Sequence, residues 1–142
     1  MTQPRRTATV RFTVPFVDVD AMGVVWHGNY LRYFDLARDR LLRDAGLDLY
    51  RGVEDGIVFP VTRMQAKHIR ALRFRDEVDC TATLVEWECR LVVDFEIRQT
   101  GGTLCTKGRT EQVAVRLGEA KAALELRLPE TVRRALAAPA AR

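Results

Sequence analysis

The segment Asp18-Val-Asp20-Ala-Met-Gly23-Val-Val-Trp-His27 places two carboxylates, a glycine and an imidazole in one short stretch of the chain. A carboxylate can attack an activated carbonyl or activate a water molecule, and such chemistry also needs donors aimed at the developing oxyanion. Seven residues after Asp20 the chain reaches a predicted helix, whose free N–H groups polarise a carbonyl without any charged side chain. The residue types and their spacing therefore favour attack on a polarised carbonyl.

Each of these side chains also has a structural interpretation. Asp18 and Asp20 are two residues apart, so in an extended segment they project on the same side and can form a coupled pair. An aspartate close to a glycine commonly accepts hydrogen bonds from loop amides. A histidine such as His27 at the start of a helix can be a capping or packing residue. Local sequence alone leaves these alternatives open.

The elements around this segment are predicted by the spacing of apolar residues. Alternation from Thr7 to Val19 predicts a half-buried strand, in which Pro15 requires an edge position or a bend. The segment from Asp18 to Gly28 is then a shaped loop. From Asn29 onward apolar residues recur at helical spacing, which predicts an amphipathic helix of about four and a half turns; they are Tyr30, Phe34, Ala37, Leu41 and Ala45. Asn29 or the residue before it caps this helix, and Gly46-Leu47 ends it.

The second half of the chain reads as four extended segments, over residues 57–69, 78–87, 91–99 and 103–117. In the third, four apolar residues share one face, namely Leu91, Val93, Phe95 and Ile97, and Asp94, Glu96 and Arg98 share the other. Gly101-Gly102 predicts a two-residue hairpin turn, and residues 119–128 have helical propensity. Pro129 opens a short terminal helix over 128–137, and the tail from about Ala138 is expected to be mobile.

Length and composition indicate one globular domain spanning residues 1–142, since 47% of the residues are hydrophobic and 30% are charged. Three cysteines without CxxC spacing, beside two histidines, disfavour a disulfide scaffold and a structural zinc site. No apolar run is long enough for membrane insertion, and we expect a cytoplasmic protein. The net charge of +4 suits anionic ligands but falls short of a nucleic-acid-binding signature.

The order strand, helix and four strands predicts an α+β arrangement, with an antiparallel sheet packed on a single helix. One helix cannot cover both faces of a five-stranded sheet. We therefore expect the other face to be wetted or to meet a partner.

The segment from Asp18 to Arg38 resembles the 4-hydroxybenzoyl-CoA thioesterase-like family of hotdog-fold acyl-CoA thioesterases. The family pattern is an acidic residue, two residues, glycine, a few apolar residues, often histidine, then Asn-Tyr and a helix ending in Ala-Arg. The order of elements extends the resemblance to about Pro129. It implies a hotdog fold, a curved antiparallel five-stranded sheet wrapped around one long helix. It also implies a homodimer or homotetramer, in which dimers form by sheet pairing and acyl-CoA sites lie at the subunit interface.

The resemblance implies an enzyme that hydrolyses an acyl-CoA thioester to the free acid and CoA, without metal or organic cofactor. Asp20 takes the role of the carboxylate, either as a nucleophile that forms a transient anhydride or as a base that activates water. The oxyanion donor falls near the backbone N–H of His27, and the His27 side chain helps to place substrate or water. Gly23 lets the loop approach the substrate. Asp18 is then a solvated or hydrogen-bonded loop residue.

Substrate-binding residues follow from the same resemblance. Met22, Val25 and Trp26 are candidates for the acyl pocket, with a plain core role as the alternative for each. Tyr30 matches the family, although its place on the apolar stripe also suits a core role. Arg38 also matches and is expected to form ion pairs. A basic loop holds Arg70, Arg73 and Arg75 near Lys67, where CoA phosphates approach in relatives, and guanidinium groups bind phosphate through two hydrogen bonds. Leu72 stands where a proline is usual, so a purely solvated loop is the competing interpretation.

Two alternatives to acyl-CoA hydrolysis remain at this stage. Similar proteins release acyl or polyketide chains from acyl-carrier proteins, and some of those lack the acidic residue that is present here as Asp20. A hotdog domain could also bind acyl-CoA without hydrolysing it. The identity of the acyl group depends on pocket depth and is not predicted.

Overall fold

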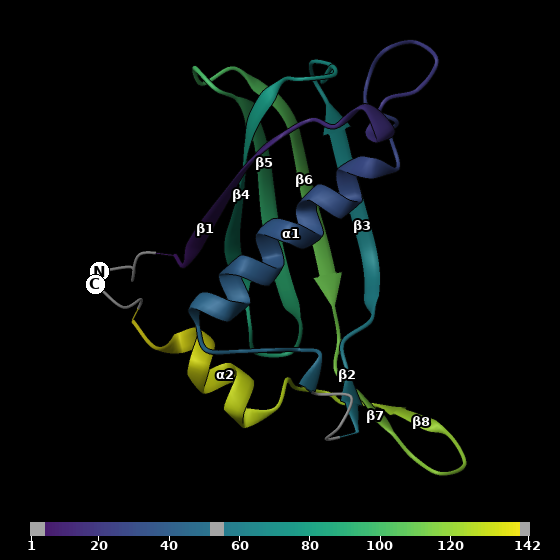
Figure 1. Ribbon diagram of the computed structural model, residues 1–142. Coiled ribbons are helices and arrows are strands. Elements are labelled where there is room, and N and C mark those ends of the chain that lie inside the picture. The colour runs from purple at the N-terminus through teal and green to yellow at the C-terminus, as the bar shows by residue number, and fades with distance from the viewer. Residues whose placement is uncertain (1–4, 52–55, 140–142) are drawn as a thin grey trace.

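One long helix lies against the concave face of a five-stranded antiparallel sheet in the computed structural model, which describes residues 5–51 and 56–139 (Figure 1). The strand order is β1-β4-β5-β6-β3. The main elements are β1 (Thr7–Thr13), η1 (Phe16–Asp18), α1 (Asn29–Asp44), β3 (Val61–His68), β4 (Glu77–Glu86), β5 (Leu91–Gln99) and β6 (Leu104–Gln112). A small second sheet and a C-terminal helix follow, namely β2 (Ile57–Val58), β7 (Val115–Leu117), β8 (Ala122–Leu124) and α2 (Glu130–Ala137). The predicted α+β hotdog arrangement is confirmed.

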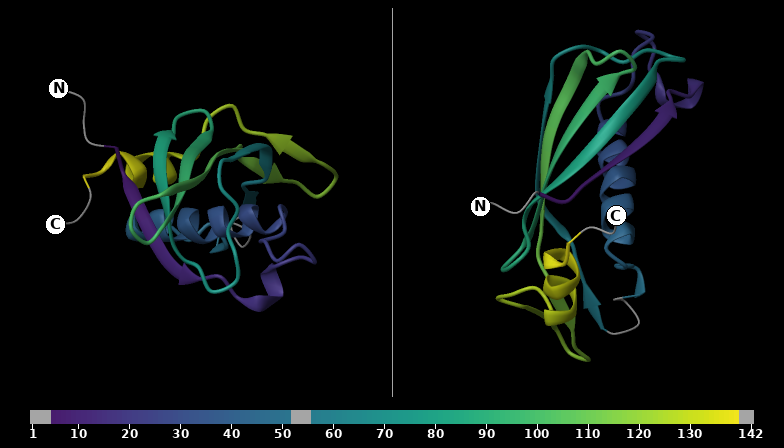
Figure 2. Two further views of the ribbon diagram at one scale, coloured as in Figure 1. Left: turned by 90° about the horizontal axis from the view of Figure 1, so that it is seen from above. Right: turned by 90° about the vertical axis from the view of Figure 1, so that its left-hand side faces the viewer.

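The central strand β5 confirms the predicted alternation of faces. Its four apolar residues Leu91, Val93, Phe95 and Ile97 are each at most 1% exposed. The intervening Asp94, Glu96 and Arg98 lie on the outer face, where Asp94 is opposite Arg109 and Glu96 is opposite Lys107. Figure 2 shows the sheet curving around α1, with α2 near the end of the sheet away from the start of α1.

Helix α1 packs through aromatic residues that the predicted stripe contained. The ring of Phe34 stacks on that of Phe95 at 4.6 Å between centroids, and Gly108 gives it room because a Cβ there would collide with the Phe34 ring. The predicted end is confirmed, since Gly46 has a φ of +78° and the Leu47 N–H donates to Leu42 O at 2.9 Å. Of the two predicted cap positions, the residue before Asn29 is confirmed, because Gly28 is the N-cap, and no side-chain hydrogen bond from the described residues caps the helix.

Several predicted boundaries of strands and loops were wrong. Strand β1 ends at Thr13, because Pro15 breaks it and η1 follows, although its edge position is confirmed. The expected extended run 57–69 is divided into β2 and β3, and the expected last strand 103–117 into β6 and β7. Residues 119–128 form no helix but contribute β8, which pairs with β7. The Gly101-Gly102 turn belongs to a connection of residues 100–103, longer than the predicted two residues.

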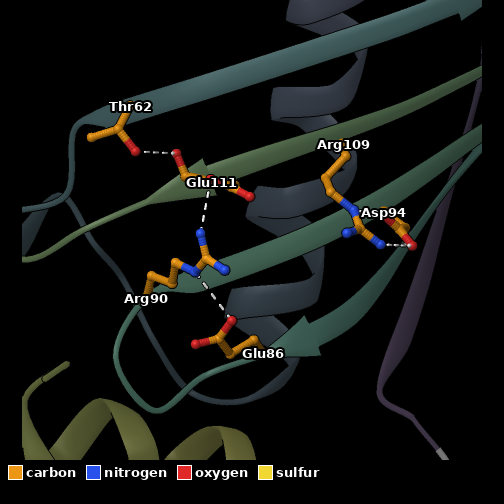
Figure 3. Close-up of polar contacts among 6 residues, drawn as sticks. All are labelled: Thr62, Glu86, Arg90, Asp94, Arg109 and Glu111. Carbon is orange, nitrogen blue, oxygen red and sulfur yellow. Dashed lines mark hydrogen bonds and ion pairs between the residues drawn. The ribbon is translucent and has the colours of Figure 1, made fainter.

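The outer face of the sheet is polar and internally paired. Arg109 donates two hydrogen bonds to Asp94, at 2.6 and 3.0 Å, and Arg90 contacts both Glu86 and Glu111 (Figure 3). Figure 3 shows these side chains on the side of the sheet away from α1. The charged alternate residues therefore suit contact with water.

Strand β3 forms the other edge of the sheet, and all eight of its residues are exposed.

Arg38 on α1 is buried and pairs with Asp35 at 2.5 Å, which agrees with the ion-pair interpretation. Within the described residues, no helix has the length and apolar character that crossing a membrane would require. The tail from about Ala138 was expected to be mobile, and its residues 140–142 lie outside the described residues.

Candidate active site

The loop between β1 and α1 is folded back on itself by a tight turn at Asp20. The Gly23 N–H donates to the Asp20 carbonyl at 2.9 Å, and the Asp20 N–H donates to Val24 O at 2.8 Å. Gly23 has a φ of +79°, a left-handed conformation that favours glycine. The loop is also fastened to the segment after β3, because the Val25 N–H donates to Leu72 O at 2.8 Å. Gly23 therefore shapes the loop that presents Asp20.

Asp20 lines a cavity of about 240 Å³. Its Oδ1 accepts a hydrogen bond from the Met22 N–H at 2.8 Å, which is the amide contact expected of a turn aspartate. Its Oδ2 accepts no hydrogen bond from the described residues, so one oxygen is held while the other is available. The cavity is lined by Asp20, Met22, Val24, Val25, His27, Tyr30, His68, Ile69, Arg70 and Ala71.

The start of α1 supplies unused donors beside this cavity. Among the described residues, the backbone N–H groups of His27 and Gly28 donate to no backbone or side-chain acceptor. The indole of Trp26 covers Gly28 so closely that a Cβ at that position would collide with it. A carbonyl oxygen placed at this end of the helix would meet free amides and the positive end of the helix dipole.

His68 is a site residue that the sequence analysis did not select. It ends β3, and its ring lies 4.4 Å from the Tyr30 ring between centroids, at a steep angle. Tyr30 is 3% exposed, its hydroxyl accepts from the Leu72 N–H at 3.4 Å, and burial raises its pKa. The sequence holds two histidines, His27 and His68, and the fold brings both to one cavity although forty-one positions separate them. The small number of histidines was the one feature of the sequence that could have pointed to His68, but it does not say which residues lie near each other in space.

Asp18 is separated from the cavity although it stands two residues from Asp20. Its side chain is 3% exposed, and its Oδ2 accepts from the Tyr33 hydroxyl at 2.6 Å while its Oδ1 pairs with Arg32. The interpretation of Asp18 as a hydrogen-bonded loop residue therefore agrees with the structure. Of the two candidate aspartates, Asp20 is the one that lines the cavity.

The predicted substrate-binding residues divide into two groups. Val25, Tyr30 and Arg70 line the cavity together with Asp20 and His27, as does Met22. Gly23, Trp26 and Arg73 do not line it. Gly23 acts in the turn, Trp26 is 51% exposed over Gly28, and Arg73 is an exposed residue whose N–H donates to Asp76 Oδ2 at 2.8 Å.

Two larger hollows offer less for carbonyl chemistry. One, of about 460 Å³, lies over the outer face of the sheet, where Asp94 and Glu96 are paired with arginines. The other, of about 420 Å³, lies beside the C-terminal half of α1, where Asp35 and Asp39 are likewise paired with arginines. Across residues 5–51 and 56–139, no three His, Cys, Asp or Glu side chains form a group that could hold a metal ion.

Comparisons with known proteins identify the family of the chain. The family model of the thioesterase-like superfamily matches residues 14–136. The chain is 28% identical over 116 residues to 4-hydroxybenzoyl-CoA thioesterase of Pseudomonas sp. strain CBS-3, covering 78% of this chain and 82% of that protein. It is 27% identical over 107 residues to 1,4-dihydroxy-2-naphthoyl-CoA hydrolase of Thermosynechococcus vestitus, covering 74% and 73%.

A crystal structure of the Thermus thermophilus hypothetical protein TT1821 superposes with a TM-score of 0.79 at 32% identity, covering 91% of this chain and 96% of that one. The crystal structure of the Pseudomonas thioesterase gives a TM-score of 0.80 at 24% identity, covering 92% and 99%, which shows the shared fold. The family match spans both the Asp20 loop and the sheet that carries His68. The chain therefore belongs to the thioesterase-like superfamily, as its resemblance predicted, and is a hotdog-fold thioester hydrolase.

Proposed function

We propose that this thioester hydrolase acts on acyl-CoA, with Asp20 as the catalytic carboxylate and the N-terminus of α1 as the oxyanion site. The observation that carries the proposal is a cavity lined by both Asp20 and His27. Asp20 Oδ2 accepts no hydrogen bond from the described residues, and the N–H groups of His27 and the adjacent Gly28 donate to no described acceptor. Preorganised amides aimed at a developing oxyanion are among the largest contributions to acyl transfer. A thioester carbonyl between these two groups would be polarised from one side and attacked from the other.

Two routes use this arrangement. In the first, Asp20 Oδ2 removes a proton from water, the hydroxide adds to the thioester carbon, and the tetrahedral intermediate expels the CoA thiolate. In the second, Oδ2 adds to the carbon directly, the thiolate leaves, and water hydrolyses the resulting anhydride. In both routes the His27 and Gly28 amides stabilise the oxyanion. The Met22 N–H holds Oδ1, which fixes the direction of the free oxygen.

The walls of the cavity suggest the rest of the substrate. Val25 and the rings of Tyr30 and His68 present apolar and aromatic surface to an acyl group. Arg70 lines the same cavity and supplies a guanidinium to an anionic carrier. The names of two relatives, 4-hydroxybenzoyl-CoA thioesterase and 1,4-dihydroxy-2-naphthoyl-CoA hydrolase, make aromatic acyl-CoA esters the first substrates to assay. The exposed Arg73 and Arg75 leave an acyl-carrier protein as a second carrier to include.

We also propose that the protein is a homodimer joined along β3. Among the described strands, none pairs with the outer side of β3, which exposes Met64 and Val61, and such edges are normally paired or protected. His68 ends the strand, so a partner paired there would lie beside the cavity. The ion-paired outer face of the sheet suits contact with water better than an apolar contact, which favours the β3 edge over that face as the dimer interface.

A CoA-dependent reaction and three free cysteines favour a cytoplasmic location.

The deciding experiment measures thiol released from a panel of short, long and aromatic acyl-CoAs, and from the same acyl groups carried on acyl-carrier protein. Hydrolysis of at least one acyl-CoA by the wild-type protein is expected. Binding of acyl-CoA without release of thiol would identify a binding protein instead, and hydrolysis confined to the carrier-protein substrates would reassign the carrier. Light scattering is expected to give at least twice the chain mass of 16.2 kDa, whereas an active monomer would contradict pairing along β3.

A further inference from the structure

Asp18 forms contacts that join both ends of the Asp20 loop to α1. Its carbonyl oxygen accepts from the Trp26 N–H at 2.9 Å and from the Asn29 side-chain amide at 2.9 Å. Its carboxylate accepts from the Tyr33 hydroxyl at 2.6 Å and pairs with Arg32. One residue at the start of the loop thus contacts the end of the loop and the first turns of the helix.

The burial of this carboxylate is unusual for a loop residue. The Asp18 side chain is 3% exposed, and a buried carboxylate is costly unless its oxygens are hydrogen-bonded. Here each oxygen has a partner, and both partners come from α1. Tyr33 is itself held, at 2% exposure, against Phe12 of β1 with 4.5 Å between ring centroids. The anchor is therefore rigid on the helix side.

Two catalytic components depend on this anchor. Asp20 follows Asp18 by two residues, and the free N–H groups of His27 and Gly28 lie between Trp26 and Asn29, both of which bond to the Asp18 carbonyl. If the loop shifts against the helix, the distance between Asp20 Oδ2 and these amides changes. A misplacement of about 1 Å can cost roughly 100-fold in rate, because attack requires close alignment of the reacting atoms.

We propose that Asp18 is a positioning residue for thioester hydrolysis, which sets the carboxylate of Asp20 opposite the N-terminus of α1. The inference rests on the proposed function of Asp20. Asp18 does not touch the substrate, because its oxygens are occupied by Tyr33 and Arg32 outside the cavity. Its effect on the reaction therefore passes through Asp20 and the amides.

The test is a double-mutant cycle in single-turnover hydrolysis of whichever acyl-CoA the wild-type protein turns over fastest. Asp18→Asn should lower kcat by roughly 10- to 100-fold with KM changed by less than about threefold. Tyr33→Phe, which removes one hydrogen bond and keeps the ring, should give a smaller loss in the same direction. In the Asp20→Asn background, Asp18→Asn should cause a clearly smaller loss, since the part of its effect that passes through the Asp20 carboxylate is already gone.

The matched control is Asp94→Asn, which likewise removes a carboxylate with a partner at each oxygen. Both oxygens of Asp94 bond Arg109, on the outer face of the sheet (Figure 3). This variant should leave kcat at the wild-type value. Amide hydrogen exchange of residues 19–28 should become faster in Asp18→Asn and stay unchanged in the control. Equal losses from Asp18→Asn in the wild-type and Asp20→Asn backgrounds would overturn the proposal, as would a wild-type exchange rate in this loop. If the wild-type protein hydrolyses no acyl-CoA, the proposed function fails, and hydrogen exchange still tests the anchor separately.

Discussion

Replacing Asp20 by Asn is the sharpest perturbation of the candidate site. The amide oxygen of Asn can keep the hydrogen bond from the Met22 N–H, so the turn closed by Gly23 should survive. What is lost is the free oxygen in the cavity, which is both the basic and the nucleophilic group. General-base assistance contributes roughly 10²- to 10⁴-fold, so kcat should fall by that factor, equivalent to about 2.7 to 5.4 kcal/mol in the activation free energy.

The assay measures released thiol under single-turnover conditions, and acyl-CoA binding by calorimetry, on variants shown by circular dichroism to be folded. Binding should persist in Asp20→Asn, because the proposed contact with the anionic carrier is made by Arg70 and not by Asp20. Asp79→Asn is the control, since Asp79 bonds Arg11 on the outer face of β4 and its loss should leave turnover unchanged. Near-normal kcat in Asp20→Asn would refute the assignment, and a larger defect in Asp18→Asn would move the catalytic role to Asp18.

Three further outcomes are expected. Arg70→Ala should raise KM for acyl-CoA several-fold with little change in kcat, and the rise in KM should be larger at low salt. Arg73→Ala should raise KM less, because Arg73 does not line the cavity. Steady-state kinetics at two ionic strengths checks this, and an equal rise in KM in the two variants would contradict it. Burial and the hydrogen bond to Asp18 raise the pKa of Tyr33 above its ordinary value of 10.0, so the free energy of unfolding should fall as pH rises above 10, and denaturant titrations should show a smaller fall in Tyr33→Phe. Gly108→Ala should lower the free energy of unfolding by about 1–3 kcal/mol, because the added Cβ meets the Phe34 ring; an unchanged denaturation midpoint would show that the ring can move aside.

Much of the architecture was predictable because hydrophobic periodicity reports directly on burial. The spacing from Tyr30 to Leu41 predicted α1, the alternation in Leu91–Ile97 predicted the inward face of β5, and Gly46 predicted where the helix ends. The errors fall where local propensity competes with pairing. Residues 119–128 favour a helix locally, yet Ala122–Leu124 pairs with β7, since ladder hydrogen bonds outweigh a weak helical preference.

For the candidate site, the sequence by itself determined the loop that carries Asp20, the glycine that turns it and the helix that follows. Those features depend on residues close together in the chain. The tertiary structure decided what is distant in sequence: His68 reaches the cavity because β3 ends there, and Arg73 is kept out of it although it stands beside Arg70 in the same basic loop. It also decided between Asp18 and Asp20, because a turn after Val19 leaves Asp20 in the lining of the cavity, while Tyr33 and Arg32 hold the Asp18 carboxylate against the helix. Spacing along the chain cannot distinguish two aspartates whose surroundings come from another element.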